Sequence, residues 1–436
     1  MNQKSITNAP AEGANSMTTA QTEQPIDHEA LPFPSKNAPE LIKTLVKQLP
    51  PCWQQTAALA LLPALSTAAG GVRYAQGKPL AFQVAIYGMA GSGKSLYTCR
   101  PAQLVQEIVA RHDNDYRMKS NDCPRVLGFE TSIIQLGKYL QRNSRRTVML
   151  YTDEISQSVG TKSSFLQLQP IIRKGFDAIS HIMDYKEENS FKGSITPRLS
   201  FLACGTSDKV FQYFDAKAIE EGTSRRVVFV EHTVCKKEID PVSYTPQEKD
   251  YITQQIEWLE QQNCELHNEE IEQAVKKWKA SKQKFYDEDD VKRLMVNTPA
   301  DVFKRAAYLA YTLNHYSKTK ESITFGKWVA EYMIRAAMHH TFSELKNIQE
   351  KGKTHFCITS EKANRSINKN MFKDLPQTFT YQEMVAYRQE HNYPGDAKNS
   401  AILTRWQEKG YIKKTKKGTY QKLNSHLLTL KKNKTT

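Results

Sequence analysis

The sequence predicts an α/β fold: a parallel sheet with helices on both faces, followed by a helical region and a small C-terminal domain. Three observations lead to this prediction. Between residues 81 and 240, short apolar segments alternate with helical stretches, which is typical of parallel strands joined by helical crossovers. Residues 246–345 have the periodicity of long helices. Residues 373–425 follow the order helix, turn, helix, hairpin.

The predicted elements follow from local patterns. We expect one helix over residues 38–70, because Leu41 and Leu45 have helical spacing and two glycines end the pattern. A later helix is expected to begin at Thr298, with Pro299 in its first turn and Asp301 as its cap. The predicted strands are 82–87, 125–129, 147–152, 199–205 and 226–231.

Changes in composition divide the chain into segments. The first of them has almost no large apolar side chains, so we expect it to be disordered. The predicted segments are a disordered arm (1–30), an α/β core (31–240), a helical lid (241–345), a linker (346–372), a winged helix (373–425) and a basic tail (426–436).

The bulk composition limits the possible partners. The chain has 436 residues and a formal net charge of +15, which favours polyanionic partners, although such a surplus can also serve solubility alone. Its seven cysteines include no C-x-x-C pair, which argues against a disulfide framework or a zinc site. No apolar run is long enough to span a bilayer. We therefore expect a cytoplasmic protein with no membrane partner.

A phosphate-binding loop follows the first predicted strand. Its residues are Gly88, Met89, Ala90, Gly91, Ser92, Gly93, Lys94 and Ser95. Glycines let the backbone turn its N–H groups toward phosphate oxygens, and a helix beginning at the loop adds its positive dipole end. Lys94, expected in a solvated position, would contact the β- and γ-phosphates, and Ser95 would bind Mg²⁺. The sequence thus predicts a P-loop NTPase that uses ATP and Mg²⁺, with Pro101 kinking the helix after the loop.

Two acids end the third predicted strand, about sixty residues after the loop. Asp153 would hold the Mg²⁺ shell through water, and Glu154 would act as general base on the attacking water. Acids also follow strands as helix caps. Glu130, which follows the second predicted strand, is an alternative base.

Two further groups could complete a catalytic site. Thr206 follows the fourth predicted strand and could contact the γ-phosphate or the water, although it could equally be a plain strand end. Arg225 is a candidate arginine finger, with Arg226 as the second choice. An ordinary basic loop is the alternative for both arginines. A finger supplied by a neighbouring subunit would require an oligomer.

These motifs, in this order, resemble the AAA+-like ATPases of primase–helicase proteins from bacterial mobile elements and phages. The resemblance covers about residues 31–345, from a Leu-Pro-Phe-Pro lead-in at Leu31, through the loop and Asp153-Glu154, to the arginine pair. It implies an AAA+-like sheet, a homo-oligomer such as a hexameric ring, and a role close to that of replicative helicases. No primase motif is apparent, so a separate primase or other replication protein is an expected partner.

Two regions are candidate DNA contacts. By analogy with related helicases, Lys186 and Lys192 would belong to a hairpin that grips single-stranded DNA in a pore, although the intervening Glu187 and Glu188 would repel phosphate. The winged helix would bind duplex DNA through its second helix and wing, unless it binds a protein instead. Its candidate contacts are Lys398, Arg405, Lys409, Lys414, Lys416 and Lys417.

The expected function is that of an ATP-hydrolysing DNA motor or replication initiator. Two alternatives stay open. One is a DNA-binding regulator that uses ATP as an assembly switch. The other is a RecA-like helicase core in which Glu130 is the base.

Overall fold

Five parallel strands form the central sheet, in the order β4-β5-β8-β3-β9. Every strand expected from the sequence is present and pairs in parallel, with ends that differ by at most two residues. The strands are β3 (Gln83–Tyr87), β4 (Val126–Gly128), β5 (Val148–Thr152), β8 (Leu199–Gly205) and β9 (Val228–Glu231).

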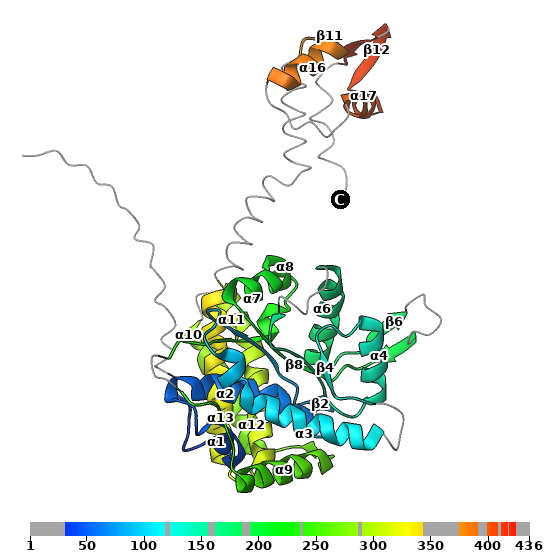
Figure 1. Cartoon of the computed structure of the whole chain (residues 1–436). Helices are drawn as coiled ribbons and strands as arrows, with labels where there is room; N and C mark the ends of the chain where they lie inside the picture. The colour runs from blue at the N-terminus through cyan, green and yellow to red at the C-terminus, as the bar shows by residue number, and fades with distance from the viewer. Residues whose placement is uncertain are drawn as a thin grey trace, which may run out of the picture. The chain divides into compact units, whose positions relative to one another are not determined.

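Figure 1 shows the computed structural model, in which the chain forms two units, residues 1–346 and 347–436. The described residues are 31–117, 123–155, 162–184, 192–235, 239–286, 290–342, 375–390, 399–408, 411–416 and 418–423. The predicted arm, the predicted linker and the predicted tail all lie outside these ranges. No helix in the described ranges is both long and apolar enough to cross a membrane.

Both faces of the sheet are buried under helices. Along β3, Val84 and Ile86 belong to one apolar core, and Ala85 and Tyr87 belong to another, because alternate residues of a strand point to opposite faces. The first core includes helices α1 (Glu40–Val46), α2 (Pro51–Ala68) and α3 (Arg100–Arg117), and the second includes α4 (Ile133–Arg142), α6 (Lys162–Asp177) and α7 (Ser207–Tyr213). The predicted α/β class is therefore confirmed.

Helical structure is present within residues 38–70 as expected, but it is divided between two helices. Pro50 has an extended backbone, with φ −60° and ψ 151°, and Pro51 is the first residue of α2. A residue that precedes a proline is kept out of the helical region, so the pair ends α1 and starts α2. Every residue of α2 from Gln55 to Ala68 is buried, which makes it a central helix.

Among the described residues of the first unit, six helices follow the sheet: α9 (Pro246–Gln261), α10 (Glu269–Phe285), α11 (Asp290–Met295), α12 (Asn297–Leu313), α13 (Thr319–Ala336) and the π-helix η4 (Ala337–Phe342). Helices α9, α10, α12 and α13 share the first core with α2, whereas Met295 of α11 and Ala337 of η4 form a small cluster of their own. The long helices expected from residue 246 are present. Because α9, α10, α12 and α13 pack into the apolar core on one face of the sheet, they belong to the same compact unit as the sheet.

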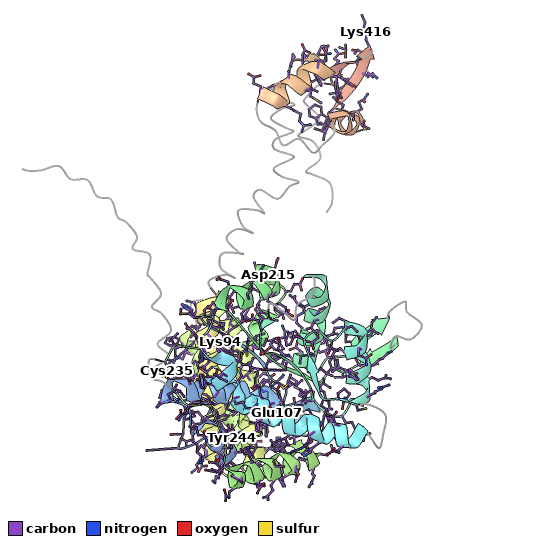
Figure 2. The ribbon with its side chains drawn as sticks, in the orientation of Figure 1. Lys94, Glu107, Asp215, Cys235, Tyr244 and Lys416 are labelled. Carbon is purple, nitrogen blue, oxygen red and sulfur yellow. The ribbon has the colours of Figure 1, made fainter. Side chains whose placement is uncertain are left out.

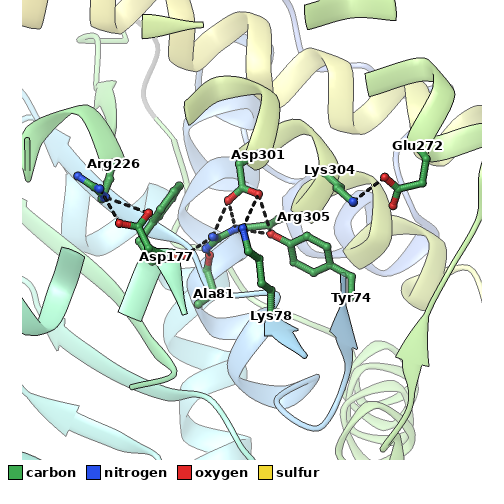
Figure 3. Close-up of polar contacts among 10 residues, drawn as sticks. Tyr74, Lys78, Ala81, Asp177, Arg226, Glu272, Asp301, Lys304 and Arg305 are labelled. Carbon is green, nitrogen blue, oxygen red and sulfur yellow. Dashed lines mark hydrogen bonds and ion pairs between the residues drawn. The ribbon is translucent and has the colours of Figure 1, made fainter. Parts of the chain in front are cut away.

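Asp301 does not cap its helix as expected. Helix α12 begins at Asn297, and Val296 precedes it without a side-chain cap. Asp301 is then beyond the first turn, where the N–H groups already have helical partners. Its carboxylate instead accepts hydrogen bonds from Tyr74 Oη at 3.0 Å and from Arg305 Nη2 at 2.6 Å (Figure 3).

Several short elements carry too few residues for a periodic signal. A small sheet joins β1 (Arg73–Tyr74), β2 (Lys78–Pro79) and β10 (Glu265–Leu266), and a hairpin joins β6 (His181–Asp184) and β7 (Lys192–Ile195). The helices α8 (Ala216–Glu220) and η3 (Ser224–Arg226) lead into β9.

The second unit has two helices and a three-stranded antiparallel sheet in the order β11-β13-β12. Phe379, Met384, Leu403 and Trp406 are in its core. The two helices and the hairpin that we expected are present, and Gly418 has φ +79° between the hairpin strands. The elements are β11 (Thr378–Thr380), α16 (Tyr381–Glu390), α17 (Asn399–Glu408), β12 (Ile412–Lys416) and β13 (Thr419–Lys422).

Candidate nucleotide site

Three predicted motifs lie at the carboxyl ends of parallel strands of the sheet. The glycine-rich loop follows β3, Thr206 follows β8, and Asp153-Glu154 follows β5. These strands are parallel and β8 lies between the other two. Neighbouring strands are about 4.8 Å apart, so the axis of β5 is roughly 10 Å from that of β3. The loop and the acidic pair therefore follow strands that are two strand spacings apart, and Thr206 follows the strand between them.

The loop has a backbone that glycine permits. Gly91 and Gly93 have φ +72° and +87°, values that other residues rarely adopt. A Cβ on Gly93 would also lie 2.6 Å from the Tyr97 ring. The loop leads into a π-helix, η2 (Lys94–Thr98), in which Cys99 N–H bonds to Lys94 O at 2.9 Å. Helix α3 begins at Arg100, so Pro101, which has no N–H to donate, is its second residue. The irregular part of the helical segment is the π-helix that precedes α3.

Lys94 is buried rather than solvated as expected, with 8% of its surface exposed (Figure 2). Its Nζ donates to Gly88 O at 3.1 Å and to Met89 O at 2.6 Å. Burial lowers the pKa of the ammonium, while the nearby Cys204 and Glu154 side chains act in the opposite direction. The ammonium therefore lies inside the loop, held by carbonyl oxygens of the loop itself.

Ser95 and Asp153 lie close together. Ser95 Oγ is 3.5 Å from the main-chain oxygen of Asp153, and the Asp153 side chain is exposed. Mg²⁺ prefers oxygen ligands and is usually bound through one or two protein groups together with substrate phosphates. The Ser95 hydroxyl and the exposed Asp153 carboxylate are oxygen ligands of the kind that Mg²⁺ prefers. Among the described residues, no group of three or more His, Cys, Asp or Glu side chains could hold a metal by itself.

Glu154 lies beside the end of β8. A Cβ on Gly205 would be 3.6 Å from Glu154 Oε1, an ordinary contact distance, and only 2.7 Å from Ile155 Cγ2, so the glycine lets the residue after Glu154 pack closely. Thr206 follows as the N-cap residue of α7, but its side chain makes no capping hydrogen bond. Glu154 and Thr206 are therefore brought to the same end of the sheet as Lys94.

Glu130 is placed further away. It follows β4, which is the edge strand beyond β5, and its side chain is exposed. The carboxylate folds over Gly128, where a Cβ would lie 1.9 Å from Oε1. Glu130 is thus one strand further from the loop than Glu154.

The two candidate finger arginines differ in their surroundings. Arg226 donates to Asp177 Oδ2 at 2.5 Å and to Gly222 O at 2.6 Å (Figure 3). Arg225 is exposed and has no ion pair with a described residue. Arg226 is therefore held by residues of its own chain, whereas Arg225 makes no such ion pair with a described residue.

Sequence reasoning missed a cluster of rings behind the loop. His232 Nε2 is 2.9 Å from Ser92 O, and its ring centroid is 4.9 Å from that of Trp53. Trp53 also stacks on Tyr97 at 5.3 Å. Burial lowers the pKa of His232, while its bond to Ser92 raises it. The sequence did contain one indication of this contact. His232 directly follows the predicted strand that became β9, and a parallel strand ends on the same side of the sheet as β3.

The predicted DNA contacts are only partly described. The hairpin expected around Lys186 exists as β6 and β7, but Lys186 and the rest of 185–191 lie outside the described residues. Lys192 begins β7. In the second unit, Arg405 is in α17, whereas Lys398, Lys409 and Lys417 lie outside the described residues.

Lys414 and Lys416 are exposed on β12, and Lys416 is labelled in Figure 2. This strand is at the edge of its sheet. Edge strands often carry lysines because these residues discourage pairing with other chains. The position of the two lysines therefore suits phosphate contacts and also suits protection of the edge.

No protein-family model matches this sequence, and no curated protein matches it significantly.

Proposed function

We propose that this chain is an AAA+-like P-loop ATPase that acts on DNA as a motor or replication initiator. The observation that carries the proposal is the meeting of three strand ends at one sheet edge: the glycine loop after β3, Thr206 after β8 and the acidic pair after β5. A phosphate-binding loop alone would bind a nucleotide. The carboxylate two strands away gives the same site a candidate base.

Each residue has a definite role in this proposal. The loop N–H groups and Lys94 bind the β- and γ-phosphates of ATP. Ser95 and Asp153 hold Mg²⁺, which neutralises charge that develops on the phosphates. Glu154 accepts a proton from the attacking water, and Thr206 orients that water or the γ-phosphate.

The strand order favours Glu154 over Glu130 as the base. Between β5 and β3 there is only β8, whereas both β5 and β8 separate β4 from β3. At about 4.8 Å per strand, Glu130 would need to reach roughly 5 Å further than Glu154 to contact the same water.

DNA is the proposed macromolecular partner. In the second unit, the order β11-α16-α17-β12-β13 supports a winged helix, whose second helix and wing would contact duplex DNA. Hairpin β6-β7 would contact single-stranded DNA, and the assembly would be a homo-oligomer that recruits a separate primase or other replication protein.

The test is ATP turnover by the full chain, measured alone, with single-stranded DNA and with duplex DNA. We expect Mg²⁺-dependent hydrolysis that DNA accelerates. Lys94→Ala should bind no nucleotide, since it removes the ammonium at the centre of the loop, and should cost little stability because the other loop contacts remain. Hydrolysis without any response to DNA would favour the ATP-switch regulator. Parental ATP affinity in Lys94→Ala would show that the site is elsewhere.

Arg225→Ala is expected to lower turnover by ~10³–10⁵, the usual range for an arginine finger, without changing the melting temperature. Because a finger acts across a subunit boundary, mixing Arg225→Ala with Glu154→Gln should restore activity. One of the composite sites then has both the glutamate and the arginine. ATPase assays over a series of mixing ratios measure this.

The matched control is Arg226→Ala. It should lower the melting temperature, because Arg226 pairs with Asp177 in the same subunit, and it should not complement Glu154→Gln better than Arg225→Ala does. If mixing restores no activity at any ratio, Arg225 is not a finger supplied in trans.

A further inference from the structure

Four arginines gather at the edge of the sheet opposite the candidate nucleotide site. Arg145 and Arg146 lie in the turn that precedes β5, and Arg198 immediately precedes β8. Arg73 is in β1. Arg198 Nη1 donates to Arg145 O at 3.0 Å, and Arg198 is close enough to Arg73 for the two charges to repel each other. We refer to Arg73, Arg145, Arg146 and Arg198 as the arginine edge.

The arginine edge has no acidic partner among the described residues. Other arginines of the chain are paired: Arg125 with Asp113 at 2.7 Å and Arg305 with Asp301 at 2.6 Å. At the arginine edge, by contrast, Arg73 Nε is buried without a hydrogen-bond partner. Burial, followed by the charge of Arg73, lowers the pKa of Arg198. Partly buried cations without a counter-charge are costly, so an anion bound here would relieve that cost.

A cavity of about 640 Å³ adjoins the arginine edge, and Arg145 and Arg146 are among the residues that line it. Its lining also includes the acids Asp113, Glu257 and Glu260. Asp113 and Glu260 pair with Arg125, and Glu257 is 3.8 Å from His112 Nε2. These acids therefore have partners other than Arg145 and Arg146, whose guanidinium groups are left for an external anion.

We propose that the arginine edge binds the phosphate backbone of duplex DNA. Arginine suits phosphate because its planar guanidinium donates two parallel hydrogen bonds. Arg73 and Arg198 do not line the cavity, so the row of arginines extends past it. An extended row of cations suits successive phosphates of a nucleic-acid backbone better than one phosphate ion.

The duplex form follows from the residues that line the cavity. Among its described lining residues there is no Phe, Tyr or Trp. Single strands are generally bound by stacking their bases on such rings, whereas a duplex presents phosphates and keeps its bases stacked. The proposal rests on the proposed function for the choice of DNA, but it needs no nucleotide chemistry.

The test is the salt dependence of duplex binding by the full chain without nucleotide, measured by fluorescence anisotropy of a labelled duplex. Each phosphate contact contributes about 0.9 to the slope of log affinity against log salt. Arg145→Ala/Arg146→Ala should therefore reduce the slope by about 1.8. Both side chains are exposed, so circular dichroism and melting temperature should be unchanged. The control is Lys276→Ala/Lys277→Ala, which removes two adjacent exposed cations from α10 of the same unit and should change the slope less.

The same comparison is repeated in a Lys414→Ala/Lys416→Ala background, to separate the arginine edge from the second unit. The proposal is supported if the arginine variant lowers the salt-dependence slope more than the lysine control does, both in the parent chain and in the Lys414→Ala/Lys416→Ala background. Equal slopes in the arginine and control variants, or no duplex binding by the parent chain, overturn it. Absence of ATPase activity in the parent chain would count against the proposed function alone, because the binding assay contains no ATP.

Discussion

Glu154→Gln is expected to keep its affinity for ATP while its turnover falls by ~10²–10⁴, the usual loss when a general base is removed. The substitution preserves the shape of the side chain and removes its ability to accept a proton. Glu154 also lies close enough to Lys94 to influence the ammonium. Because the new amide remains a hydrogen-bond acceptor, we expect the loop and the Lys94 position to survive. Turnover and binding of a fluorescent ATP analogue, measured on the same preparation, separate the two effects.

The matched control is Glu130→Gln. Glu130 is exposed and lies beyond β5, at the edge strand, so its loss should leave turnover within a few-fold of the parent. If Glu130→Gln lost activity and Glu154→Gln did not, the base would be Glu130 and the RecA-like alternative would replace the present proposal.

The sequence predicted the strands and motifs of this site better than their arrangement. Strands β3, β5, β8 and β9 were recognisable because nearly all of their residues are buried, so each reads as an apolar run. The order of the strands in the sheet depends on how the crossovers pack, which no local pattern records. The placement of β8 between β3 and β5 is what separates the roles of Glu154 and Glu130.

Side-chain environments were the least predictable feature. Lys94 was expected in solvent, but its ammonium folds onto the carbonyls of its own loop. Arg225 and Arg226 are adjacent in the sequence and differ only because Asp177, at the end of α6, binds one of them. Trp53 comes to the loop from α2, far earlier in the sequence. The contacts of Arg226 and Trp53 join segments that are distant along the chain, so only the packed structure reveals them.

Arg305 joins three parts of the first unit, and its removal should strongly destabilise the fold. The side chain is 0% exposed. It donates to Tyr74 Oη at 3.0 Å, to Ala81 O at 2.8 Å and to Phe176 O (Figure 3). Its ion pair with Asp301 spans 2.6 Å. Since α12 holds this arginine, the helices after the sheet are bonded through it to β1, to the chain before β3 and to the end of α6.

Arg305→Met should lower the free energy of unfolding by about 3–5 kcal/mol, the usual cost of removing one partner from a buried ion pair. The loss leaves Asp301 without its main counter-charge and two buried carbonyl groups without donors. Urea unfolding followed by circular dichroism measures the change. The control is Lys304→Met on the same helix. Lys304 pairs with Glu272 near the surface, where such pairs contribute up to about 1 kcal/mol.

A second substitution identifies the cause of the destabilisation. Removing both partners of a buried pair is often close to neutral, so Asp301→Asn should recover part of the stability lost in Arg305→Met. If Arg305→Met were no more harmful than Lys304→Met, the network would not be what joins these helices to the sheet. Arg305 also packs on the Phe176 ring, with Cζ 3.9 Å from its centroid, and Asp177 beside it holds Arg226. Loss of Arg305 should therefore loosen the arginine pair as well, and lower turnover in variants that still fold.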